Sequence, residues 1–246
     1  MATLQNEHIV SSYEEELTLL AQSISEMGGE VEAAIASGTK ALLKLDHALA
    51  RQTIDADKRI DEMQRRIDET AVSMIARRQP MAVDLRAVIT SIHVANDLER
   101  VGDMAKQVSR RTLQIDSLAL APKFYNGLKH MTDLILAQLK AALDAYATRN
   151  AAAAIAVCNR DDEIDAIYTS IFRELLTYMM EDPRTIGMGT HLLFVAKNIE
   201  RAGDHCTNIA EVVYHMVRAG HLANNRPKAD HTSETSVPFE TRETHA

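Results

Sequence analysis

The sequence predicts an all-α protein built from two tandem three-helix bundles, six long helices in all, related by an internal pseudo-symmetry. Apolar residues recur with the 3.6-residue period of a helix along nearly the whole chain. Three of the five prolines, Pro80, Pro122 and Pro183, fall between the periodic segments, where helix breaks are expected. A five-residue acidic motif occurs at residues 99–103 and again 101 residues later, at 200–204.

Residues 1–120 are expected to form the first three helices. The first runs from about Glu7 to Lys44, and the glycines at 28 and 29 are a place where it can bend. Asp46 is a good N-cap for the second helix, which ends before Pro80. The third begins near Asp84 and carries an apolar stripe at helical spacing, made of Leu85, Val88, Ile92 and Ala95.

Residues 121–220 are expected to repeat this plan. The fourth helix covers about 123–148, Asn150 caps a fifth that ends at Pro183, and the sixth covers about 189–219. Loops this short make neighbouring helices antiparallel, so each repeat is an up-down-up bundle. Residues 221–246 are polar and poor in large apolar side chains, which predicts a disordered tail.

The amino-acid composition limits the classes of core, partner and site that the protein can have. The chain is 46% hydrophobic but only 4% aromatic, so Ala, Leu, Ile and Met form the core, as is typical of helices. A net charge of −8 argues against nucleic acid as a partner. Cys158 and Cys206 make neither a disulfide framework nor a zinc site. Since neither a signal peptide nor a membrane span is seen, we expect a soluble cytoplasmic protein.

The repeated motif places two carboxylates on one face of a helix, because positions i and i+4 are neighbours there. Like charges at this spacing repel, so the repetition suggests that a positive charge lies between them. Glu99 and Glu200 continue apolar stripes and should lie beside the bundle seam, where an unpaired carboxylate is costly. Gly102 and Gly203, each costing about 1 kcal/mol against Ala in a helix, indicate a close approach to the backbone.

Two further acidic pairs, 104 residues apart, stand in the second and fifth segments: Asp57 with Asp61, and Asp161 with Asp165. Antiparallel neighbours can bring four carboxylates to one level in each repeat. Oxygen-only clusters suit hard cations such as Mg, Mn or Fe. Asn208 extends the stripe of the second repeat.

Other interpretations stay open. Arg100 and Arg201 follow the two glutamates and could pair with acids of a neighbouring helix, which would make the carboxylates surface or ion-pair residues. A carboxylate-bridged metal-dependent enzyme is a second possibility, although the sequence has no P-loop, zincin motif or nucleophile elbow. The Glu-x-x-His of ferritin-like oxidases is also missing. A purely structural helical scaffold is the third.

The motifs at residues 78–86 (RQPMAVDLR) and 198–205 (NIERAGDH), continued by NIAE at 208–211, resemble the PhoU family of phosphate-specific transport regulators. The resemblance covers residues 7–219. It implies a cytoplasmic, non-enzymatic regulator that is usually a homodimer. It also implies coupling of the ATPase subunit of a phosphate ABC transporter to a sensor histidine kinase, as a negative regulator that meets the membrane only through its partners.

The resemblance further implies multinuclear metal sites on the duplicated acidic motifs, with the other acids joining them. The metal could be Fe, Zn, Mn or Mg. The ligands expected on this basis and on the spacing are Asp57, Asp61, Glu99, Asp103, Asp161, Asp165, Glu200, Asp204 and Asn208.

Overall fold

The computed structural model describes residues 2–118 and 120–220, with the backbone alone for residues 2–12 and Asp161. This part of the chain is helical and contains no strand, which confirms the predicted all-α class. The helices in chain order are α1 (Ala2–Lys44), α2 (His47–Arg78), α3 (Val83–Thr112), α4 (Pro122–Ala147), α5 (Ala151–Cys158), α6 (Asp161–Glu181), the short 3-10 helix η1 (Pro183–Thr185) and α7 (Ile186–Arg218).

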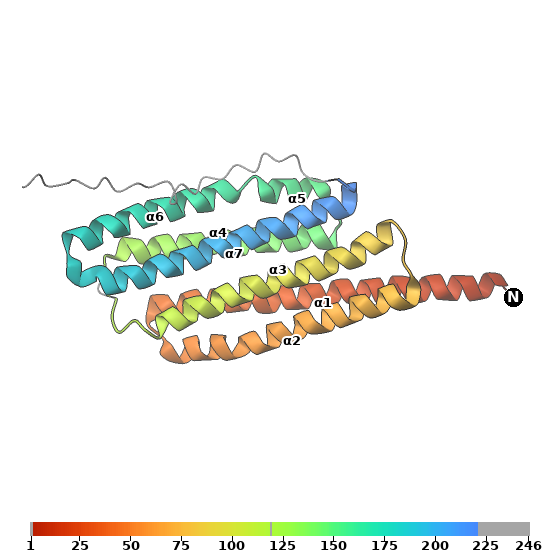
Figure 1. Ribbon diagram of the computed structural model, residues 1–246, viewed down its shortest axis with the longest axis horizontal. Coiled ribbons are helices and arrows are strands. Elements are labelled where there is room, and N and C mark those ends of the chain that lie inside the picture. The colour runs from red at the N-terminus through yellow and green to blue at the C-terminus, as the bar shows by residue number, and fades with distance from the viewer. Residues whose placement is uncertain (1, 119, 221–246) are drawn as a thin grey trace, which may run out of the picture.

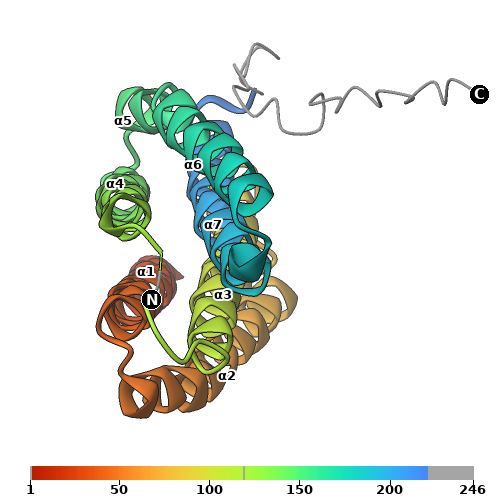
Figure 2. The same ribbon diagram turned by 90° about the vertical axis from the view of Figure 1, so that its left-hand side faces the viewer.

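The helices run side by side along the long axis of the molecule (Figure 1). Seen end-on, α1, α2 and α3 make one three-helix group, and α4, α7 and the α5–α6 pair make another (Figure 2). Two contacts join the groups, α3 with α7 in the centre and α1 with α4 beside it. The buried apolar side chains of both groups form one continuous core cluster.

The fifth segment differs from the prediction, because it is not one helix. It breaks at Asn159 and Arg160 into α5 and α6. Both pieces turn apolar side chains to the core: Ala154 and Val157 of α5 and Ile164 of α6 are buried.

Local capping sets several helix ends as the sequence predicts. The Asp46 carboxylate accepts a hydrogen bond of 2.9 Å from the Leu49 amide at the start of α2. The Asn150 side chain accepts two, of 3.0 and 3.1 Å, from amides of the first turn of α5. Such caps satisfy amides that have no partner within the helix.

The glycines at 28 and 29 do not end or divide α1, which is a single continuous helix. Gly28 instead makes room for α4, because a Cβ at this position would overlap the Leu143 side chain. The close approach that the sequence indicated for Gly102 and Gly203 is also a helix contact. A Cβ on Gly102 would lie 3.1 Å from Ile60 of α2, and one on Gly203 would lie 3.1 Å from Ile164 of α6.

Cys206 is completely buried, as a small core residue should be. No helix in residues 2–118 and 120–220 is both long and apolar enough to cross a bilayer. The expected limits of the repeats, 1–120 and 121–220, stay predictions. The predicted disordered tail, 221–246, lies outside the described residues.

Candidate metal-binding clusters

The acidic residues of the first repeat come together where α2 packs on α3. We call Asp57, Asp61, Glu99 and Asp103 cluster 1. Burial raises the pKa of Glu99, and the negative charges of Asp103, Asp61 and Asp57 raise it further. Burial and the neighbouring Asp57 likewise raise the pKa of Asp61. The four carboxylates are therefore close enough to repel one another, as the spacing predicted.

A lysine supplies much of the positive charge in cluster 1. The Lys106 ammonium forms an ion pair with Asp57 and donates a hydrogen bond of 3.1 Å to Asp103. These two bonds, above all the one to Asp57, raise the pKa of Lys106. The Asp57 side chain is only 5% exposed, so its charge needs such a partner.

Arg100 pairs within its own helix. Its guanidinium lies 3.5 Å from the Glu99 carboxylate and 3.9 Å from that of Asp103. The alternative in which Arg100 reaches a neighbouring helix is therefore not what the structure shows. Because this guanidinium is mostly exposed, its pairs add little to stability.

Cluster 2 is the counterpart in the second repeat and consists of Asp165, Glu200 and Asp204, with Asp161 at the start of α6. Glu200 is only 4% exposed, and burial raises its pKa to about 7. Lys197 opposes the rise by donating a hydrogen bond of 2.8 Å to Glu200, while Asp204 and Asp165 add to it. Asp165 is buried as well.

The two lysines could have been found from sequence. Lys106 lies three residues after Asp103, and Lys197 lies three residues before Glu200, which are both neighbouring positions on a helix surface. They are not equivalent in the repeats, since the 101-residue offset pairs Lys106 with Thr207 and Lys197 with Asn96. The clusters are duplicated, but their counter-ions are not.

Asn208 lies in the contact between the repeats. Its side-chain amide donates to the Asp97 carboxylate of α3 at 3.4 Å, and His205 Nδ1 lies 2.9 Å from the same oxygen. In this structure Asn208 therefore binds Asp97, and not a carboxylate of cluster 2.

The donor chemistry of both clusters fits a hard cation. One carboxylate oxygen of Asp57 and one of Glu200 are buried without a hydrogen-bond partner. Both clusters are rich in carboxylate oxygens, the ligands that Mg, Mn and Fe prefer. Among the described side chains, however, no group of three His, Cys, Asp or Glu is arranged to hold a metal ion. The lysine ammonium groups supply positive charge at these clusters instead.

The family model for the PhoU domain matches the chain twice, over residues 24–112 and 128–213. The chain belongs to the PhoU family. It is 50% identical to the phosphate-specific transport system accessory protein PhoU homolog of Rhizobium meliloti, over 94% of this chain and 97% of that protein. The PhoU homolog of Caulobacter vibrioides is 45% identical over 93% of this chain and 99% of the relative.

Solved PhoU structures share the fold. The crystal structure of PhoU from Pseudomonas aeruginosa superimposes with a TM-score of 0.81 at 38% identity, covering 85% of this chain and all of that one. The phosphate transport system regulatory protein PhoU from Streptococcus pneumoniae gives 0.80 at 29% identity, covering 86% and 99%. The resemblance of the sequence to the PhoU family is thus confirmed.

Proposed function

We propose that this protein is an accessory regulator of a phosphate transport system and not an enzyme. One observation carries the proposal: the chain matches proteins named phosphate-specific transport system accessory protein over 93–94% of its own length. The match spans both three-helix groups. The name of the Streptococcus pneumoniae relative, a phosphate transport system regulatory protein, supports the same role.

The more specific proposal is a cytoplasmic negative regulator. It binds the ATPase subunit of a phosphate ABC transporter and a sensor histidine kinase, and it keeps the starvation response off when phosphate is plentiful. The protein works as a homodimer and meets the membrane only through these partners. The resemblance of residues 78–86 and 198–211 to the family pattern supports this role.

Pull-down with tagged full-length protein from cells grown in high and in low phosphate tests the regulatory proposal. We expect the transporter ATPase and the kinase to be recovered, in amounts that differ at least several-fold between the two conditions. Deletion of the gene should switch on the starvation response in high phosphate. Recovery of neither partner in either condition, together with an unchanged response after deletion, would refute the proposal.

We further propose that clusters 1 and 2 bind cations, drawn from Fe, Zn, Mn and Mg. Asp57, Asp61, Glu99 and Asp103 would hold one group of ions, and Asp161, Asp165, Glu200 and Asp204 the other, with Asn208 recruited from the contact between the repeats. The two buried carboxylate oxygens without partners support this. Burial raises the pKa values of Glu99 and Glu200, and the neighbouring carboxylates raise them further; a bound cation would neutralise this added repulsion.

Metal analysis of protein purified without chelator tests the clusters. The double variants Glu99→Ala with Asp103→Ala, and Glu200→Ala with Asp204→Ala, should each lose about half of the bound metal, because each removes two carboxylate ligands. Glu69→Ala with Glu181→Ala is the matched control, since it removes two exposed carboxylates from α2 and α6. Equal metal content in all variants would favour the purely structural scaffold.

A further inference from the structure

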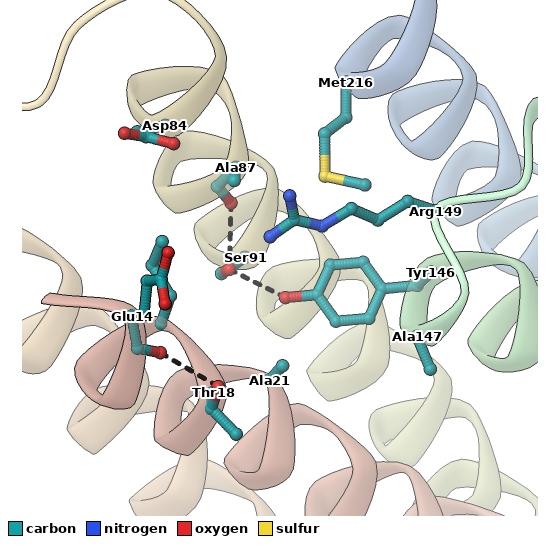
Figure 3. Close-up of a pocket in the computed structure, with 11 residues that line it drawn as sticks. Glu14, Thr18, Ala21, Asp84, Ala87, Ser91, Tyr146, Ala147, Arg149 and Met216 are labelled. Carbon is teal, nitrogen blue, oxygen red and sulfur yellow. Dashed lines mark hydrogen bonds between the residues drawn. The ribbon is translucent and has the colours of Figure 1, made fainter. Parts of the chain in front are cut away.

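A polar cavity of about 500 Å³ lies at one end of the molecule, where α1, α3, α4 and α7 meet. It shares no lining residue with either carboxylate cluster. Figure 3 shows the Arg149 side chain reaching into it from the turn after α4, with Ser91 and Tyr146 beside it. The Glu14 and Asp84 carboxylates lie on the other side. Helices of both repeats form its walls.

The internal repeat shows that the fold does not require Arg149. Leu45 occupies the same turn in the first repeat, because both residues have φ of 49°. The amide of Arg149 donates to the carbonyl of Tyr146 at 3.1 Å, and the amide of Leu45 donates to that of Leu42 at 3.2 Å. Arg149 therefore corresponds to Leu45, and Tyr146 corresponds to Leu42.

Ser91 also has a leucine at the equivalent position of the other repeat. The 101-residue offset of the acidic motifs on α3 and α7 pairs Ser91 with Leu192. Leu42 of the first repeat and Leu192 of the second are completely buried in the core, so the equivalent places hold apolar side chains. Ser91 of the first repeat, and Tyr146 and Arg149 of the second, each stand where the opposite repeat has a leucine. Packing alone does not explain Ser91 and Tyr146, which are buried, because burial of an apolar side chain is the more stabilising choice.

The cavity is rich in hydrogen-bond acceptors. The Ser91 hydroxyl donates to the Ala87 carbonyl at 3.0 Å, so the contact of 2.8 Å between Ser91 and Tyr146 is donated by the Tyr146 hydroxyl. Both hydroxyls therefore have only lone pairs left to offer. Thr18 also uses its proton within α1, on the Glu14 carbonyl. Among the described side chains that line the cavity, the free N–H groups are those of Arg149.

The charges of the cavity are divided between its two sides. In Figure 3 the Arg149 guanidinium stands apart from the Glu14 and Asp84 carboxylates on the other side of the cavity. Tyr13 lies at the same end of the molecule. Burial raises the pKa of its hydroxyl, the negative charge of Asp84 raises it further, and the positive charge of Arg149 opposes the rise. With one guanidinium facing two carboxylates, an anion alone would meet a net negative site. A cation without an acidic group would make no use of the Arg149 guanidinium, which is exposed.

We propose that this cavity binds a small zwitterion of the α-amino acid class. The carboxylate of the ligand pairs with Arg149, and its ammonium groups bind Asp84, Glu14 and the hydroxyl lone pairs. A basic amino acid matches the charges best, since it brings two ammonium groups against two carboxylates. The volume lies within the usual range for small-molecule sites, about 300–1,000 Å³. The proposal is independent of the metal clusters and of the transport role.

Isothermal titration calorimetry of the full chain with lysine, glycine, glutamate, acetate and ethylamine tests this. Lysine should bind most tightly and glutamate most weakly of the three amino acids. Acetate and ethylamine, which each carry only one of the three charged groups of lysine, should bind at least tenfold more weakly than lysine. Failure of all three amino acids to bind at about 10 mM, or acetate binding as tightly as lysine, would overturn the proposal.

Variants of the cavity assign the contacts. Arg149→Leu should lower lysine affinity at least tenfold without unfolding the protein, because Leu45 adopts the same turn. Asp84→Asn should lower lysine affinity more than acetate affinity. Arg160→Leu, which removes an exposed arginine between α5 and α6, is the control and should leave binding unchanged. Unchanged lysine affinity in both cavity variants would refute the site.

Discussion

Replacing Lys106 by Met is expected to destabilise the protein by about 3 kcal/mol at neutral pH. The substitution leaves the buried Asp57 carboxylate without its ion-pair partner, among three other carboxylates. Removing one member of a buried pair typically costs about 3–5 kcal/mol, and the partial exposure of Lys106 places the expected value at the lower end. Urea unfolding at pH 7.5, in the presence of a chelator, measures the change.

A second substitution distinguishes the ion pair from a packing effect. Asp57→Asn in the Lys106→Met background should restore most of the lost stability, because no uncompensated charge then remains. Lys58→Met is the matched control. Lys58 and its partner Asp55 are both more than 70% exposed, so its loss should cost less than about 0.5 kcal/mol. A cost below about 1 kcal/mol for Lys106→Met, or no recovery with Asp57→Asn, would contradict the arrangement of cluster 1.

Glu200→Gln is expected to stabilise the metal-free protein at alkaline pH. Burial raises the pKa of Glu200 from 4.5 to about 7, so the folded chain holds this proton more tightly than the unfolded chain. The free energy of unfolding therefore falls as pH rises from about 4.5 to about 7. The linkage relation gives a loss of about 3 kcal/mol across this interval.

The Gln variant lacks this titration, so its advantage over the wild type should grow from near zero at pH 5 to about 2–3 kcal/mol at pH 8. Denaturant unfolding in chelator at several pH values measures it. Glu99 and Asp61 of cluster 1, whose pKa values are also raised, leave some pH dependence in the variant. Glu181→Gln, which removes an exposed carboxylate of α6, should parallel the wild type. Parallel profiles for Glu200→Gln would show that Glu200 does not titrate in this way.

The sequence specifies much of the fold through features that act over a few residues. The apolar period, the prolines and the caps Asp46 and Asn150 are local, and the structure confirms the helices that they predict. The break between α5 and α6 could not be predicted from the apolar spacing, because the spacing continues across it: the buried Val157 and Ile164 lie seven residues apart, on the same face of a continuous helix.

The candidate sites were predictable only in part. The spacing of Glu99 and Asp103 indicates that they share a face, but the depth of burial that sets Glu200 apart depends on how α6 and α7 pack. The cavity could not be predicted, because Ser91 and Tyr146 lie 55 residues apart and meet only through the contact between the repeats. Each residue lies on the buried face of its own helix, but the spacing within one helix does not show which side chain of another helix it meets.

The unequal lysines of the two clusters have a consequence for the proposed binding of cations. Two identical clusters, each occupied by an identically placed lysine ammonium group, would bind and release cations over the same narrow range of ion concentration. Lys106 bridges Asp57 and Asp103 of cluster 1, whereas Lys197 pairs with the deeply buried Glu200 of cluster 2 and lies over the Tyr168 ring. If the clusters bind cations as proposed, each ion would displace a differently held ammonium group in each half of the molecule. The two halves would then fill at different ion concentrations, which would widen the range over which the protein responds.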